Sequence, residues 1–126
     1  MSVAPTNNPA ITLVAGTAIT KNRLVSLGAG GVADLCPVNG IPIGQSMADV
    51  DAGDLQGVRL PQAGTLVLTA LTAIAVGAQV HTAANGKVND VAASTSRPFG
   101  VALSAAAADG DLIEVLPLVH QGAAVA

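Results

Sequence analysis

The sequence repeats itself once, and this internal repeat limits what the chain can fold into more than any other feature. Thr17-Ala18-Ile19 recurs as Thr72-Ala73-Ile74, at an offset of 55 residues. Further on, Gly53-Asp54-Leu55 recurs as Gly110-Asp111-Leu112, at an offset of 57. The matches are mainly glycine, proline, aspartate and β-branched residues, although a biased composition would favour alanine matches. The sequence therefore predicts two like units in tandem.

Two single-residue insertions, one at Lys87 and one near Asp109, explain why the offset grows. The chain length of 126 residues suits one compact domain. We expect flexible arms at both ends. The expected divisions are an N-terminal arm over 1–10, one β domain over 11–120 with repeats over about 17–60 and 72–117, and a C-terminal tail over 121–126.

Both copies place turn-forming residues at the same points, which predicts short strands between them. Asn85-Gly86 is a strong hairpin signal because both residues tolerate the left-handed backbone of a type I′ turn. Gly28–Gly31 stands at the matching place, and Ser104–Ala108 is too short for more than a single turn or a loop. We expect a mainly β fold, a small β-sandwich or barrel built from the two tandem repeat units. The expected strands include 11–14, 23–27, 32–35, 55–60, 66–69, 79–82, 87–91 and 112–119.

The apolar core is short of bulky side chains. Phe99 is the only aromatic residue, and much of the 51% apolar content is alanine. Val, Leu and Ile must then supply the core, at about 1.5–3 kcal/mol for each fully buried side chain. A small core of this kind gains stability by burying surface against identical neighbours, so we expect an oligomer.

Charge is sparse, at 10% of residues and a net −3, and the five basic residues are scattered. Without a basic stripe, direct nucleic-acid binding is not expected. The first ten residues lack the positive charge of a signal peptide, and the apolar stretch over 66–80 is interrupted and too short to span a bilayer. We expect no membrane association, and synthesis in the cytoplasm.

Catalytic constellations are weak. His81, Asp90 and Ser94 include the residue types of a triad, but no Gly-x-Ser-x-Gly elbow surrounds the serine. His81 corresponds to Ser26 in the other copy, which fits ordinary variation at a strand position, and His120 lies near the C-terminal tail. We expect no catalytic residue and no enzymatic activity.

Asp49, Asp51 and Asp54 resemble a fragment of a calcium loop but do not complete the EF-hand pattern. We interpret them as an acidic turn, because Asp54 recurs as Asp111. No Gly-Lys-Ser/Thr follows the glycine run, so it is no phosphate loop. Cys36 is the only cysteine and is expected to be a small buried side chain. Neither a metal nor a cofactor is expected.

The order of the repeated motifs resembles a known family. Thr-Ala-Ile…Val, Asn-Gly-Lys-Val, Pro-x-Gly-x-Ala and Gly-Asp-Leu-x-x-Val-x-Leu follow one another between about Ile11 and Val119. This succession is similar to small phage proteins that serve as capsid cement or head decoration proteins. The resemblance implies a homotrimer on the outer surface of the phage head, bound to the major capsid protein at three-fold or quasi-three-fold points. It also implies stabilisation of the expanded shell, without catalysis.

Candidate contact residues follow from apolarity and from the Pro/Asn-rich arm, which suits strand addition to an exposed sheet edge. A flexible arm without a binding role would also explain the arm residues. A plain buried strand would also explain the apolar residues of the final strand. The capsid-binding candidates are Pro5, Asn7, Asn8, Pro9, Ile11, Leu13 and Val14. The trimer-interface candidates are Phe99, Leu112, Ile113, Val115, Leu116 and Leu118.

Two other classes of function remain open. One is a different virion component, such as a trimer associated with a tail or fibre. The other is a ligand-binding β module, for example for a carbohydrate. Sugar sites usually stack the ring on an aromatic face, and a single Phe makes this alternative the weaker one.

Overall fold

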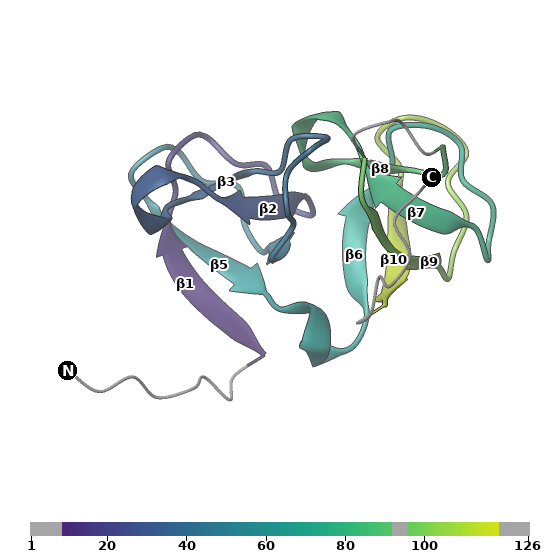
Figure 1. Cartoon of the computed structure of the whole chain (residues 1–126), viewed down its shortest axis with the longest axis horizontal. Helices are drawn as coiled ribbons and strands as arrows, with labels where there is room; N and C mark the ends of the chain where they lie inside the picture. The colour runs from purple at the N-terminus through teal and green to yellow at the C-terminus, as the bar shows by residue number, and fades with distance from the viewer. Residues whose placement is uncertain (1–8, 92–95, 119–126) are drawn as a thin grey trace.

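The structure, a computed structural model, describes residues 9–91 and 96–118 (Figure 1). These residues form ten short strands and three single-turn 3-10 helices, Ala29–Gly31, Pro61–Ala63 and Ala84–Gly86. The predicted mainly β fold of two units is confirmed; both predicted terminal arms lie largely outside the described residues. In unit 1 the strands are β1 (Ala10–Val14), β2 (Leu24–Leu27), β3 (Ala33–Leu35), β4 (Gly44–Ser46) and β5 (Leu55–Arg59). In unit 2 they are β6 (Leu66–Thr69), β7 (Gln79–Thr82), β8 (Val88–Asn89), β9 (Pro98–Ala102) and β10 (Leu112–Pro117).

Each unit is one five-stranded antiparallel sheet, and the two sheets have the same strand order. Unit 1 runs β1-β5-β4-β2-β3 and unit 2 runs β6-β10-β9-β7-β8. Leu66–Thr69, expected only as a joining strand, is the first strand of the second sheet. The described residues include no helix that is long and apolar enough to cross a membrane.

The backbone hydrogen bonds outside the strands also recur, and they define counterpart residues in the two units. Ile19 exchanges two backbone bonds with Val50, at 2.9 and 3.0 Å, and Ile74 exchanges two with Ala106, at 3.0 and 2.9 Å. The Asp54 amide donates to the Asp51 carbonyl at 3.1 Å, and its counterpart, the Asp111 amide, donates to the Ala108 carbonyl at 3.2 Å. Segments with the same turn residues therefore adopt the same local structure in both units.

The loop between the second and third strands has the left-handed backbone that the sequence predicts. Gly30 and Gly31 have φ of 79° and 82°, and Asn85 and Gly86 have φ of 60° and 71°. The loop is longer than a two-residue hairpin, since Thr82 pairs with Val88 across it. The paired strands and the positive φ values are those expected of a tight β-connection.

The first insertion does not lie at Lys87. The Gly28 amide donates to the Val32 carbonyl at 2.8 Å, and the Ala83 amide donates to the Lys87 carbonyl at 2.9 Å. Both loops thus have the same length, and Lys87 is the counterpart of Val32. The extra residue falls later, between β8 and Gly100, where the pairing of β7 with β9 shifts register between Val80 and His81.

Two glycines allow neighbouring strands to approach closely at the same place in each sheet. A Cβ added at Gly44 would overlap the carbonyl oxygen of Arg59, and one added at Gly100 would overlap that of Leu116. Both glycines are buried. This explains why both copies keep the glycine of Pro-x-Gly: any side chain there would push β4 from β5, or β9 from β10.

The apolar core is largest in unit 2, and it includes two residues of unit 1, Leu24 and Cys36. Ile74, Phe99 and Ile113 belong to the same cluster. A smaller cluster within unit 1 is built around Ala15, Ile19, Val25, Ala33 and Val58. The two sheets therefore share buried side chains and are not joined by a linker alone.

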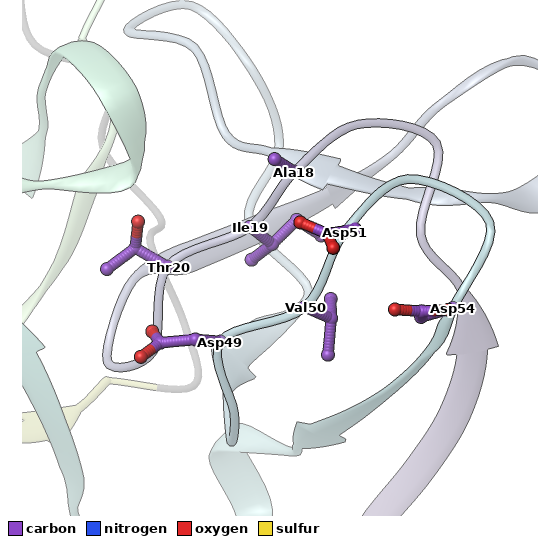
Figure 2. A pocket seen from close by; sticks show the side chains of 7 residues that line it. All are labelled: Ala18, Ile19, Thr20, Asp49, Val50, Asp51 and Asp54. Carbon is purple, nitrogen blue, oxygen red and sulfur yellow. The ribbon is translucent and has the colours of Figure 1, made fainter.

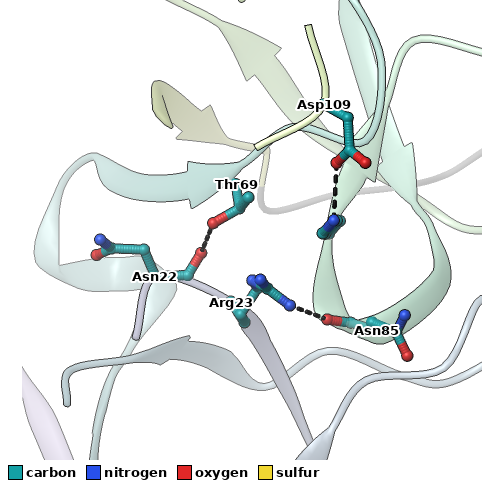
Figure 3. A network of polar contacts seen from close by, with 6 residues as sticks. Asn22, Arg23, Thr69, Asn85 and Asp109 are labelled. Carbon is teal, nitrogen blue, oxygen red and sulfur yellow. Dashed lines mark hydrogen bonds and ion pairs between the residues drawn. The ribbon is translucent and has the colours of Figure 1, made fainter. Parts of the chain in front are cut away.

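Polar contacts complete the junction between the units (Figure 3). The Asn22 carbonyl accepts hydrogen bonds from both the backbone amide and the hydroxyl of Thr69, each at 2.9 Å. An Arg23 guanidinium nitrogen donates to the Asn85 carbonyl at 3.0 Å, and the Thr82 hydroxyl donates to the Val38 carbonyl at 2.6 Å. These bonds satisfy backbone groups where the sheets meet.

Candidate interaction surfaces

The pocket in Figure 2 lies between two segments of unit 1, residues 18–20 and the loop that carries the three acidic residues. It has a volume of about 370 Å³ and includes the side chains of Asp49, Asp51 and Asp54. Asp49 Oδ1 accepts the Lys21 backbone amide at 2.6 Å, so this carboxylate closes a loop. In the described ranges, no three or more His, Cys, Asp or Glu side chains gather to hold a metal ion. The geometry supports the interpretation as an acidic turn.

The imagined triad is not assembled in the part of the chain that is described. His81 is buried in β7 and pairs across the sheet with Asn89, and its Nδ1 has no described hydrogen-bond partner. Asp90 is exposed. Ser94 and His120 lie outside the described residues. A base needs an orienting partner, and the described residues give His81 none.

Cys36 is buried, as predicted. Burial raises the pKa of its thiol from the ordinary 9.0 to about 11, against smaller lowering effects of a hydrogen bond with Ser26 and of the Arg97 charge. A thiol with this pKa is protonated at neutral pH and is a poor nucleophile. Cys36 therefore acts as a small apolar side chain at the junction of the two units.

The N-terminal candidates divide into three groups. Pro5, Asn7 and Asn8 lie outside the described residues. Pro9 is exposed, and its carbonyl accepts the Leu60 amide at 2.8 Å. On β1, Ile11 and Leu13 are half-buried beside the unit 1 cluster, and Val14 is 45% exposed. Of these β1 side chains, Val14 is the most accessible.

Half of the candidates near β10 belong to the chain's own core. Phe99, Ile113 and Val115 are 7%, 1% and 0% exposed, so they have little surface left for a second chain. They face inward because alternate residues of a strand point to opposite faces of its sheet. Leu112 and Leu116 face outward at 53% and 43% exposure, and Leu118 is half-buried. Apolarity in the sequence did not separate the two faces.

A pair of exposed apolar side chains occupies the same place on both sheets. In unit 1 the pair is Met47, 44% exposed, and Leu55, 67% exposed. In unit 2 the counterparts are Leu103, 43% exposed, and Leu112, 53% exposed. The amides of Met47 and Leu103 make equivalent bonds, to the Gly57 and Glu114 carbonyls at 3.0 and 2.8 Å. We call these two pairs the twin apolar patches.

Sequence reasoning missed three of the four patch residues, since it selected only Leu112. The signal was present in the repeat itself, because Leu55 and Leu112 are the same residue of the duplicated Gly-Asp-Leu motif. Isolated exposed apolar residues need no explanation, but here the same two positions are apolar and exposed in both units.

Comparison with known proteins places these surfaces in context. Residues 4–117 match the phage cement protein family. The chain is also similar in structure to the N base of the head fibre of bacteriophage phi29, with a TM-score of 0.72 and 26% sequence identity, covering 86% of this chain and 92% of that one. No curated protein sequence matches the chain. A family match over nearly the whole chain and a similar fold in a phage head structure agree: this chain belongs to the phage cement protein family and is a structural protein of the phage virion.

Proposed function

We propose that this protein binds the outer surface of a phage head as a homotrimer and stabilises the expanded shell. Membership of the phage cement protein family is the observation that carries the proposal. The protein is made in the host-cell cytoplasm and assembles onto the major capsid protein. Its role requires adhesive surfaces and no catalytic group.

The twin apolar patches are the surfaces that we assign to the shell. A shell repeats one subunit many times, so a chain that presents the same contact twice can engage two neighbouring copies. Weak contacts add when they are held together at high effective concentration, and a trimer multiplies them again. Leu112 thus moves from the expected trimer contact to the shell contact, because its counterpart Leu55 is also exposed on the other unit.

The duplicated contact also gives the repeat a function. Equivalent hydrogen bonds in both units and the shared strand order support an origin by internal duplication. Pro5, Asn7 and Asn8 of the N-terminal arm, together with the exposed Pro9, are proposed to add an extended segment to an exposed edge of the shell. Low surface charge favours such close packing, because few ions lose their hydration.

Co-sedimentation with emptied, expanded heads tests the proposal. The wild-type protein should pellet with heads and stay in solution with purified tails. Replacing both patch leucines, Leu55→Lys and Leu112→Lys, should weaken head binding at least about tenfold, because a buried unpaired charge costs several kcal/mol. Leu27→Lys is the matched control, since Leu27 is an exposed leucine at 56% that lies outside both patches.

Binding to tails and not to heads would favour the alternative of a tail-associated or fibre-associated component. The similarity to a head fibre base makes a fibre-bearing role on the head itself the nearer alternative. Unchanged head binding by the double variant would reject the patches as the contact. In that case the arm residues become the remaining candidates.

A further inference from the structure

Unit 1 covers the edge of β6 that does not pair with β10. Outside its pairing with β10, the Val67 amide donates to Gln45 Oε1 at 3.0 Å, and the Thr69 amide donates to the Asn22 carbonyl at 2.9 Å. Leu24 and Cys36 join the cluster that contains Leu66 and Leu68, and both of these leucines are 0% exposed. Unit 1 therefore satisfies the polar edge of β6 and covers its apolar face.

Among the described residues, the counterpart edge on unit 1 has no covering strand, and a single parallel bridge between Ala15 and Ala33 lies just beyond the end of β1. β1 pairs with β5 alone among the described strands, so its second edge carries no strand. Ile11 and Leu13, the counterparts of Leu66 and Leu68, are only half-buried. Val14 is 45% exposed, whereas its counterpart Thr69 is 5% exposed. An unpaired edge beside partly exposed apolar side chains is a surface that natural proteins normally cover.

The matching cover is exposed on unit 2 of the same chain. The segment of unit 1 that contacts β6 begins at Asn22, whose amide donates to the Ser46 carbonyl at 3.0 Å, and Gly77 makes the counterpart bond to Ala102 at 2.8 Å. Both residues have left-handed backbones, with φ of 63° and 85°. Val76, beside Gly77, is 64% exposed. Gln79 is exposed as well, whereas its counterpart Leu24 is fully buried. We call Val76–Gln79 the free cover segment.

We propose that copies of this chain associate head to tail, with the free cover segment of one copy placed on the β1 edge of the next. The contact would repeat between chains the backbone part of what unit 1 does to β6 within each chain, with Gln79 and Val101 at the places of Leu24 and Gln45. The Gly77 carbonyl would accept the Val14 amide, as the Asn22 carbonyl accepts the Thr69 amide. Ile11, Leu13 and Val14 then serve as anchors for a neighbouring copy, and not for the shell as the sequence suggested.

A second copy is the favoured occupant because one chain carries both halves of the contact. A strand from the shell would cover β1 but leave Val76, at 64% exposure, in water. Such a head-to-tail contact closes into a ring or grows into a filament. The closed ring of three copies rests on the proposed function, whereas the contact itself rests on the two exposed surfaces.

Charge-pair variants test the contact, with the molar mass measured by light scattering. A refractive-index detector supplies the protein concentration, because a chain without Trp or Tyr scarcely absorbs at 280 nm. Val14→Lys and Val76→Glu should each raise the dissociation constant of the trimer at least about tenfold, because each places an unpaired charge in the contact. The double variant places Lys opposite Glu in every contact and should recover most of the association at low salt. Leu27→Lys should remain trimeric.

Single variants that stay trimeric, with wild-type circular dichroism, would overturn the head-to-tail contact and leave the trimer of the proposed function intact. A wild-type protein that is monomeric at all concentrations yet binds heads would overturn it as well, while the shell-binding role stands. Loss of head binding by Val14→Lys without loss of the trimer would assign the β1 edge to the shell and reject a second copy.

Discussion

The two units build one topology around different interiors. Gln56 and Ser46 of unit 1 are buried at 0% exposure, and they correspond to Ile113 and Ala102 of unit 2. The larger apolar cluster accordingly belongs to unit 2. Equal strand order with unequal cores shows that the turn residues, and not the interior composition, are the common element of the two units.

The polar interior of unit 1 has a specific task, which is to hold loops in place. Gln56 Oε1 accepts the Met47 and Ala48 amides at 3.2 and 3.1 Å, and Gln56 Nε2 donates to the Ala48 carbonyl at 2.8 Å. The Ser46 hydroxyl donates to the Thr20 carbonyl at 2.6 Å. Satisfied in this way, buried polar groups cost little and fix a single conformation.

The largest effect is expected where the two units are most alike. Gly44→Ala and Gly100→Ala should each lower the free energy of unfolding by about 3 kcal/mol or more, because each new methyl group overlaps a strand carbonyl. Urea unfolding followed by circular dichroism measures this. Since the units share buried residues, each variant should unfold in one transition.

Gly57→Ala is the matched control, because its methyl group would meet the flexible Met47 side chain and not backbone. It should cost less than about 1 kcal/mol. Two separate transitions in Gly44→Ala, with only one of them shifted, would contradict the shared core and make the units independent.

An intermediate effect is expected where the units differ. Gln56→Leu should lower the free energy of unfolding by about 1–2 kcal/mol, because the Ala48 amide and carbonyl lose their partners. At the counterpart position Ile113→Leu should cost less than about 1.5 kcal/mol, since it keeps volume and polarity. Thermal unfolding of both variants provides the comparison. A neutral or stabilising Gln56→Leu would show that unit 1 does not depend on its polar interior.

The smallest effect concerns Cys36, the cysteine of unit 1 that lies in the core of unit 2. It is a loss of stability at alkaline pH, and no such loss is expected at neutral pH. Because the folded pKa of Cys36 is raised from 9.0 to about 11, the unfolded chain loses this proton first as the pH rises. The stability contributed by the protonated thiol is complete below pH 9 and declines between pH 9 and 11. Urea unfolding across this range should show a steeper decline in the wild type than in Cys36→Ala. Parallel profiles would mean that the junction leaves Cys36 open to water.

Sequence reasoning predicted most strands and turns because both depend on local chemistry. Gln79–Thr82 is a strand with the predicted bounds, and Asn85-Gly86 has the predicted left-handed backbone. The insertion assigned to Lys87 was wrong. The sequence comparison matched Val32 with Val88, whereas the equal lengths of the two loops make Lys87 the counterpart of Val32. The surface candidates were less accurate, since alternating apolar residues do not reveal which face is inside.

The sequence by itself determined where this chain turns, since glycine, asparagine and Gly-Asp pairs restrict the backbone regardless of their surroundings. It also determined that the apolar part of the interior would be almost wholly aliphatic, because Phe99 is the only aromatic residue. Only the tertiary structure decided that Leu24 and Cys36 enter the core of the other unit and that Gln56 is buried. It also decided that unit 1 covers the β6 edge, whereas no described strand covers the second edge of β1. These outcomes depend on contacts between residues far apart in the chain, which no local pattern records.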